Sequence, residues 1–240
     1  MKIAIMQPYV FPYLGYFQMI NAVDKFVLLD DVNFIKKGWI NRNQLLLNKQ
    51  PYKITLPIIK ASQNKLISEL EINPEEVWRT KLLTTLQMAY KKAPYFSEVY
   101  PLLERILNYK EMNLSKFLHH NLSCFCNYLG IQTEMVPTSS IYPKNDLRGE
   151  DRIIDICNQE GATTYINAIG GQELYGFDKF KAKNIELNFI EMDGDLNYTQ
   201  FPKMDFVPYL SIIDVTMFNS VEDTLDLLTK YTLNNSKDLF

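Results

Sequence analysis

A dense run of polar side chains, DDVNFIKKGWINRN at residues 30–43, has the composition of a site for acid–base and anion-binding chemistry. A carboxylate there can act as the base for an attacking amine, or can orient that amine. Lysine and arginine side chains can neutralise a phosphate or the negative charge that develops during a transfer reaction. The predicted catalytic residues are Asp30, Asp31 and Lys36, and Lys37 and Arg42 are predicted to bind the anionic part of the substrate.

Amide and aromatic side chains in and near this run could orient a sugar or acyl group and stack on it. Side-chain amides offer both hydrogen-bond donors and acceptors, and aromatic rings stack on the faces of sugars and bases. Some of these aromatic residues suit ordinary core packing equally well. The residues predicted to bind substrate on these grounds are Gln7, Tyr13, Tyr16, Asn33, Trp39, Asn41 and Asn43.

Two apolar segments precede these polar residues and determine whether they can meet. Residues 2–6 and 25–29 read as short strands, and residues 15–23 between them read as a helix. A right-handed β–α–β unit makes the strands parallel neighbours, and open α/β sheets bind ligands at the carboxyl ends of such strands. We therefore expect one pocket to contain Gln7, Asp30, Asp31, Lys36, Trp39, Asn41 and Arg42.

The alternative is that the charged residues of segment 30–43 bind no ligand. The carboxylates and cations could form a solvated loop, or they could pair with one another inside the protein. The two hypotheses differ in what mutation does. Loss of a ligand contact lowers binding and leaves stability intact, whereas loss of an internal ion pair mainly lowers stability.

A second group of candidate binding residues lies in the other half of the chain. Gly170–Gly171 follows a short strand and could let backbone amides approach a phosphate or sugar, although a plain turn is an equal alternative. Arg148 opens a helix whose N-terminus attracts anions, whereas Arg152 is expected to pair with a local acid. Gly170–Gly171 and Arg148 could therefore form the far wall of the pocket, and Asn167, just before the glycine pair, is also predicted to bind substrate.

The order of the remaining elements indicates the fold class. Strands alternate with helices in both halves of the chain, which favours an α/β domain with a mainly parallel, Rossmann-like sheet. A block of helices at about 73–130, which Asn73 would cap, reads as an insertion or a small helical lobe in one domain spanning residues 1–240. The other expected strands are 51–59, 132–137, 164–167 and 185–190, and the other expected helices are 151–159, 209–218 and 221–228.

Composition excludes several classes of protein. The 240-residue chain is 47% hydrophobic, so it is expected to be globular, and its net charge of −3 argues against a general nucleic-acid surface. Its apolar runs are too short for a membrane span or a secretory signal, so we expect a cytoplasmic protein. Cys124, Cys126 and Cys157 are expected to be reduced, because neither they nor His119–His120 have metal or disulfide spacing. No motif identifies a cofactor.

Four blocks of sequence resemble the WbqC-like family over nearly the whole chain. They are MKIAIMQPYVFPYLGYFQMINAVDKFV, LLDDVNFIKKGWINRN, RGEDRIIDICNQEGATTYINAIGG and YLSIIDVTMFNS, with Phe34 where tyrosine is usual. Members of that family belong with bacterial surface-polysaccharide genes, including O-antigen clusters. The resemblance therefore implies a role in making or decorating an unusual sugar.

A weaker resemblance concerns the segment PYLGYFQMINAV. It is similar to the H-x-G-H segment of nucleotidyltransferases and pantothenate synthetase, which opens a helix under a nucleotide phosphate. Tyr13 and Tyr16 stand where the two histidines would be, so the catalytic roles of those histidines do not carry over. A tyrosine can hydrogen-bond a phosphate but is not cationic near neutral pH. The resemblance thus implies the fold, described as nucleotidyltransferase-like, without the adenylylation chemistry.

Together these features predict an enzyme of bacterial surface-polysaccharide biosynthesis. It would transfer an acyl or aminoacyl group to the amine of a nucleotide-linked amino sugar. The alternative is a non-catalytic protein of the same pathway that binds the sugar nucleotide or acts as a scaffold. The alternative stands because the sequence contains no recognisable pair of nucleophile and base.

Overall fold

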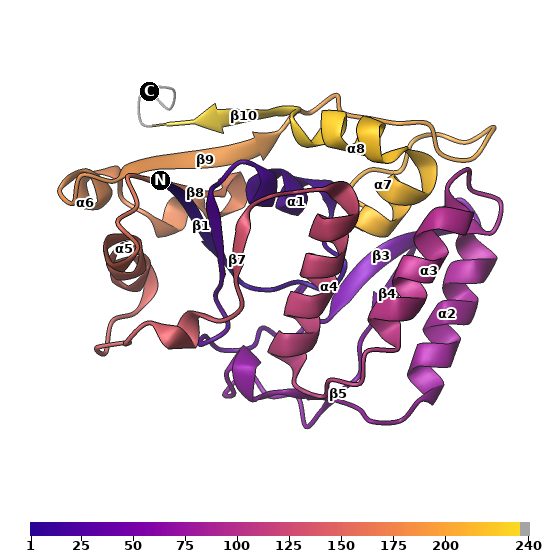
Figure 1. Cartoon of the computed structure of the whole chain (residues 1–240), viewed down its shortest axis with the longest axis horizontal. Helices are drawn as coiled ribbons and strands as arrows, with labels where there is room; N and C mark the ends of the chain where they lie inside the picture. Colours follow the sequence, from indigo (N-terminus) through magenta and orange to yellow (C-terminus); the bar gives the residue numbers. More distant parts are fainter. Residues whose placement is uncertain (236–240) are drawn as a thin grey trace.

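A six-stranded sheet forms the centre of the protein in the computed structural model, which describes residues 1–235 (Figure 1). Five strands are parallel, and the last, at one edge, is antiparallel to its neighbour. Read from one edge to the other, the order is β7-β2-β1-β8-β9-β10. When these six strands are counted from 1 to 6 along the chain, this is the 3-2-1-4-5-6 order of doubly wound nucleotide-binding sheets. The strands are β1 (Lys2–Met6), β2 (Lys25–Leu28), β7 (Glu134–Val136), β8 (Thr164–Ala168), β9 (Glu186–Met192) and β10 (Tyr231–Asn234).

The predicted fold class is confirmed, and so is the pairing on which the site hypothesis depends. β1 and β2 are adjacent and parallel near the middle of the sheet, with Ile3 opposite Lys25 and Met6 opposite Leu28. The crossover between them is α1 (Leu14–Asn21). The residues that follow β1 and β2 therefore leave the sheet at the same edge.

Different helices cover the two faces of the sheet, as the alternation along β1 indicates (Figure 1). Ile3 and Ile5 are buried in one apolar cluster with residues of α5 and α6, whereas Ala4 belongs to a larger cluster with residues of α1, α4 and α8. Successive side chains of a strand point to opposite faces, so a buried apolar strand needs helices on both sides. The covering helices are α4 (Leu114–Leu129), α5 (Gly149–Gln159), α6 (Phe177–Lys181) and α8 (Val221–Leu228).

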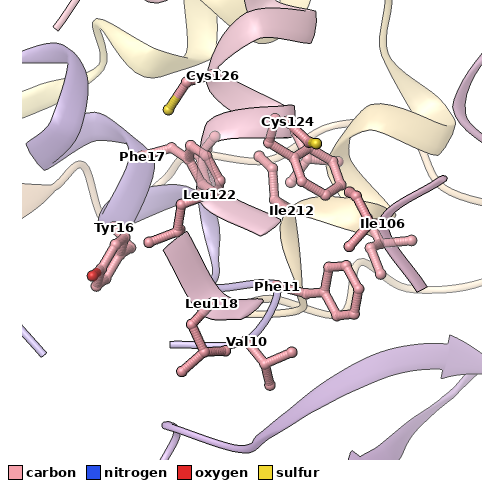
Figure 2. Close-up of a cluster of buried hydrophobic side chains, with 14 of the residues drawn as sticks. Val10, Phe11, Tyr16, Phe17, Ile106, Leu118, Leu122, Cys124, Cys126 and Ile212 are labelled. Carbon is pink, nitrogen blue, oxygen red and sulfur yellow. The ribbon is translucent and has the colours of Figure 1, made fainter. Parts of the chain in front are cut away.

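The larger cluster joins the sheet to the helical block formed by α2 (Val77–Tyr90), α3 (Phe96–Leu107) and α4. Figure 2 shows its centre, where Phe11 and Phe17 lie beside α4. Their rings contact Phe125 at centroid distances of 6.2 and 5.9 Å. The helices of this block therefore complete the core of the sheet.

The three cysteines are buried and unpaired, and two of them lie in this core (Figure 2). Burial raises the pKa of Cys126 to about 12, and it does the same for Cys157. These thiols therefore stay protonated and unreactive at neutral pH. Within residues 1–235, no group of three or more His, Cys, Asp or Glu side chains could hold a metal ion.

The segment 51–59, predicted as one strand, is divided between two small hairpins outside the central sheet. β3 (Arg42–Leu47) pairs with β4 (Gln50–Thr55), and β5 (Ile58–Ile59) pairs with β6 (Glu71–Ile72). Asn48 and Lys49 both have positive φ, 52° and 63°, which is the backbone of a two-residue hairpin turn. That turn joins β3 and β4 into one hairpin. Arg42 and Asn43, which were predicted to belong to a polar segment, are therefore the first two residues of a strand.

Two predicted helix starts are wrong, for local reasons. Asn73 does not cap α2: its side chain accepts a hydrogen bond from the backbone of Glu75, and its carbonyl accepts one from Trp78 Nε1. These bonds hold residues 73–76 in a turn, so the helix begins at Val77. The predicted helix 209–218 begins later, as α7 (Ile212–Phe218), because Ser211 is its N-cap. In the described part of the chain, no helix is long and apolar enough to cross a membrane.

Candidate functional site

A cavity of about 730 Å³ opens at the carboxyl ends of β1 and β8. Ile5, Met6 and Gln7 line it from β1 and the residue after it, and Asn167 and Ala168 line it from β8. The chain continues from β1 toward one edge of the sheet and from β8 toward the other, so this is the topological switch point, where doubly wound sheets bind ligands. The volume is typical of a small-molecule or cofactor site.

Four large apolar side chains at the mouth of the cavity are exposed. Ile35 and Trp39 come from the segment after β2, Leu174 from the 3-10 turn after β8, and Tyr209 from the segment before α7. Trp39 is 49% exposed and Tyr209 is 68% exposed. Exposed apolar groups that gather at one opening are typical of a ligand-binding surface. A bound ligand would contact groups from three separate segments.

The loop between β1 and α1, which forms part of the cavity wall, is held by buried polar side chains. Phe11 in this loop has a left-handed backbone, φ 43°, which a non-glycine residue adopts only when its surroundings impose it. Its N–H donates to Asn121 Oδ1 (2.9 Å), and its carbonyl accepts from Asn43 Nδ2 (2.8 Å) and Ser211 Oγ (2.7 Å). Three distant segments thus fix the shape of the loop.

Replacing Asn43 with alanine is expected to lower the free energy of unfolding by about 2 kcal/mol. The Asn43 amide also donates to the carbonyl of Val10 (3.0 Å), and both carbonyls that it contacts belong to buried residues. Urea denaturation measures the effect. Asn33→Ala is the control: this amide belongs to the same polar run but is exposed, and its loss should change stability by less than about 0.5 kcal/mol. Equal losses in the two variants would contradict the anchoring role.

The N-terminus of α1 faces the cavity. Gly15 in its first turn lines the cavity, and a Cβ built there would lie 2.5 Å from the ring of Tyr13, so that ring packs directly on the turn. The N-cap residue Tyr13 makes no capping bond with its side chain, and in the first turn only the Tyr16 N–H is bonded to a backbone carbonyl, that of Tyr13 (3.1 Å). The free backbone amides of a helix N-terminus attract anions such as phosphate.

The cavity is electrically neutral. The lining side chains from the described residues include no Asp, Glu, Lys, Arg or His. Burial raises the pKa of Tyr9, Tyr13 and Tyr16, so their hydroxyl groups stay protonated at neutral pH. The Tyr16 hydroxyl donates to the carbonyl of Gln7 (2.8 Å) and orients the end of β1. The arrangement can stack on a ligand and hydrogen-bond to it, but provides no charged acid or base.

The structure brings together about half of the residues that the sequence suggested. The predicted substrate-binding residues that line the cavity are Gln7, Tyr13, Tyr16, Trp39, Asn43, Asn167, Gly170 and Gly171. They come from the loop after β1, from α1, from the segment after β2, from β3, and from β8 with the turn after it. Asn167, Gly170 and Gly171 from the second half of the chain thus line the same cavity as residues from the first half, whereas Arg148 does not.

Asp30 does not line this cavity, so the predicted convergence of seven residues is wrong. Its carboxylate is buried and accepts hydrogen bonds from Ser115 Oγ (2.5 Å), Thr138 Oγ1 (2.7 Å) and the backbone of Ser139 (3.1 Å). All of these donors belong to the protein. The residue ties the end of β2 to α4 and to the segment after β7.

Asp31 is also turned away from the cavity and has internal partners. It accepts from Ser139 Oγ (2.5 Å) and pairs with Arg152, whose guanidinium lies 3.3 Å away and is 3% exposed. Lys144 lies 3.7 Å from the same carboxylate. The alternative of internal pairing therefore describes Asp31, although its partners are not the predicted cations of segment 30–43.

The other predicted residues lie outside the cavity. Asn41 is buried and donates to the carbonyl of Leu56 (2.8 Å), which ties β4 to the end of the polar run. Arg42 donates to the carbonyl of Gly38. The residues that are exposed to solvent and do not line the cavity are Asn33, Lys36, Lys37 and Arg148.

The sequence did not reveal Leu174, Tyr175 and Tyr209 as site residues. Leu174 and Tyr175 come three and four residues after Gly171, so the glycine pair was the only local signal for them. Tyr209 lines the cavity with a left-handed backbone, φ 57°. Nothing in the sequence around it indicates that conformation.

Comparisons with known proteins agree with the resemblance carried by the four blocks. Residues 7–225 match the WbqC-like protein family. "Uncharacterized protein Rv1507c" of Mycobacterium tuberculosis is 31% identical over 229 residues, which are 95% of this chain and 97% of that protein. No solved structure matches the chain.

Proposed function

The chain belongs to the WbqC-like protein family, and from that premise we propose that its neutral cavity binds a nucleotide-linked amino sugar. In a step of bacterial surface-polysaccharide biosynthesis, the amine of the bound sugar would attack the acyl carbon of an activated acyl or aminoacyl donor. The bond from that carbon to the carrier breaks as the C–N bond forms, and the carrier leaves with the amine proton. The observation that carries the proposal is the position of the cavity, at the switch point between β1 and β8 beside the first turn of α1. Sheets of this order bind nucleotides at that position.

Each part of such a ligand has a matching group in the cavity wall. The amides of α1 that precede Tyr16 suit one phosphate group, and Gly170–Gly171, which also lines the cavity, leaves room for a ligand to approach the backbone. The rings of Trp39 and Tyr209 suit a base or a sugar face. Gln7 and Asn167 add amide groups that can recognise hydroxyl or acyl groups.

The neutral lining also supports a second candidate, a binding protein without catalytic activity. Acyl transfer to a neutral amine can be accelerated by holding the two reactants together, without a charged group from the protein. General base catalysis, by contrast, needs a titratable side chain near the amine, and the described lining supplies none with a pKa near neutral. The two candidates share the ligand and differ in turnover.

Binding of a UDP-linked amino sugar, measured by titration calorimetry, tests the shared part of the proposal. We expect saturable one-to-one binding, and we expect Tyr209→Ala to weaken it about tenfold, which corresponds to roughly 1.4 kcal/mol. The tyrosine ring is largely exposed at the cavity mouth, so its loss should remove stacking without unfolding the protein.

Tyr52→Ala is the matched control, because Tyr52 is an exposed tyrosine of β4 that does not line the cavity. Its affinity should stay within about twofold of the wild-type value. Equal weakening in both variants, or no binding to the wild type, would contradict the proposal. Product formed with an added acyl donor would favour the enzyme, and tight binding without product would favour the binding protein.

A further inference from the structure

A second cavity, of about 430 Å³, lies beside α4 at the end of β2. By residue type its lining is more polar than that of the first cavity and includes the carboxylate of Asp30, although most of the surface that each cavity exposes is apolar. His119 and His120, the two histidines of the chain, both line it. Lys116 lines it one helical turn before them. This cavity therefore has a cation, which the lining of the first cavity lacks, beside imidazole and hydroxyl groups.

Two hydroxyl groups at the base of this cavity have a fixed orientation. Ser115 Oγ and Thr138 Oγ1 both donate to the buried carboxylate of Asp30, at 2.5 and 2.7 Å. Each hydroxyl has one proton, so both are committed as donors to Asp30. Thr138 Oγ1 already accepts from the N–H of Ser140 (3.1 Å) and keeps one lone pair for a ligand, whereas Ser115 Oγ keeps both of its lone pairs. The hydroxyl groups of a ligand could supply the donors. The negative charge of Asp30 itself is met by donors from the protein.

The two histidines are neutral at physiological pH. Burial lowers the pKa of His119, as does neighbouring His120, and burial together with Arg105 lowers the pKa of His120. The Nε2 atom of His119 lies 3.3 Å from Ser123 Oγ, and the ring of His120 stacks on Tyr109 at 4.0 Å. A neutral imidazole offers one donor and one acceptor, so these rings can recognise hydroxyl groups as well as an anion.

Lys116 is the cation of this cavity. Its side chain is exposed and has no ion-pair partner among residues 1–235, whereas Lys25, Lys144 and Lys179 all have one. A lysine that lines a cavity without a carboxylate partner can bind the anionic group of a ligand at no loss to an existing ion pair.

We propose that this cavity is a separate binding site for a small anion that carries hydroxyl groups, such as a sugar phosphate. Lys116 would bind the anionic group. Ser115 and Thr138 would accept hydrogen bonds from the hydroxyl groups, and the two imidazoles would complete the contacts. The site does not depend on the proposed function, because neither histidine lines the first cavity.

The two histidines make the test specific. Their ring C–H signals in an NMR spectrum report on this cavity alone, and His119→Asn and His120→Asn assign them. We expect glucose 6-phosphate, added to the full chain at constant neutral pH, to shift both signals saturably with a Kd of about 1 mM or tighter. Inorganic phosphate and neutral glucose should each bind at least about tenfold more weakly, because each lacks half of the recognised groups.

Lys116→Gln should weaken glucose 6-phosphate binding at least about tenfold. Lys183→Gln, at an exposed lysine in the turn after α6, should leave it unchanged. The proposal is overturned if the histidine signals do not shift, or if glucose alone shifts them equally. It is also overturned if inorganic phosphate binds as tightly as the sugar phosphate, or if both lysine variants lose the same affinity. A negative result for this second cavity would not contradict the proposed function of the first cavity, because binding there is measured with a different ligand and different variants.

Discussion

Replacing Arg152 with methionine is expected to lower the free energy of unfolding by about 3–5 kcal/mol. The guanidinium of Arg152 is buried and makes hydrogen bonds to Asp31 (3.3 Å) and to the carbonyls of Ser139 (3.1 Å), Tyr142 (2.9 Å) and Pro143 (2.8 Å). Methionine has a similar reach and no charge. It would leave the Asp31 carboxylate and several carbonyl groups with fewer partners in a poorly solvated place.

Arg148→Met provides the matched control, since Arg148 is exposed, four residues away and outside both cavities. Its stability should change by less than about 0.5 kcal/mol. Denaturant unfolding of both variants gives the comparison, and titration with the sugar nucleotide gives the second measurement. If Arg152→Met kept its stability but lost the ligand, Asp31 would belong to a binding site after all.

Replacing Asp214 with alanine is expected to lower the free energy of unfolding by about 4 kcal/mol. Asp214, in α7, is fully buried and accepts hydrogen bonds from Tyr90 Oη (2.9 Å), Tyr198 Oη (2.7 Å) and Gln200 Nε2 (2.7 Å). These donors come from α2 and from the segment before α7, so the carboxylate joins three parts of the chain. Alanine would leave all three donors without this acceptor in the interior.

The stability that Asp214 confers should also depend on pH. Burial raises the pKa of Asp214 above its ordinary value of 3.8, although the bonds from Tyr198, Gln200 and Tyr90 lower it. The folded state thus holds the proton more tightly than the unfolded state. The stabilisation is complete below pH 3.8 and is lost as the pH rises through the pKa of the folded protein.

Asp214→Asn isolates this effect, because asparagine keeps the shape of the side chain and does not titrate. The free energy of unfolding of the wild type, relative to that of Asp214→Asn, should fall between acid and neutral pH. A difference that stays constant over that range would mean that the carboxylate has the same pKa in the folded and unfolded states.

The sequence predicted those parts of the fold that depend on local patterns. Apolar runs marked β1 and β2, and the helical block ends where it was predicted, at about residue 130, because Gly130, with φ 72°, terminates α4. Hydrophobic periodicity and the residues that end a helix lie within a few positions of one another, so they can be recognised in a single sequence.

The partners of the charged residues could not be predicted in this way. Asp30 binds Ser115, which is 85 positions away, and Asp31 binds Arg152, which is 121 positions away. Such pairs depend on how α4 and α5 pack on the sheet, and no periodicity along the chain encodes that packing. The polar run 30–43 therefore indicated the edge of the sheet where the first cavity lies, but its two carboxylates bond to partners inside the protein and do not line that cavity.

A crystal structure of the protein with a bound UDP-linked amino sugar tests the central claim most directly. The account predicts that the ligand lies in the cavity between β1 and β8, with a phosphate at the first turn of α1 near Gly15 and a ring against Trp39 or Tyr209. A sugar nucleotide bound instead beside Asp30 and Lys36, with the first cavity holding only solvent, would contradict it.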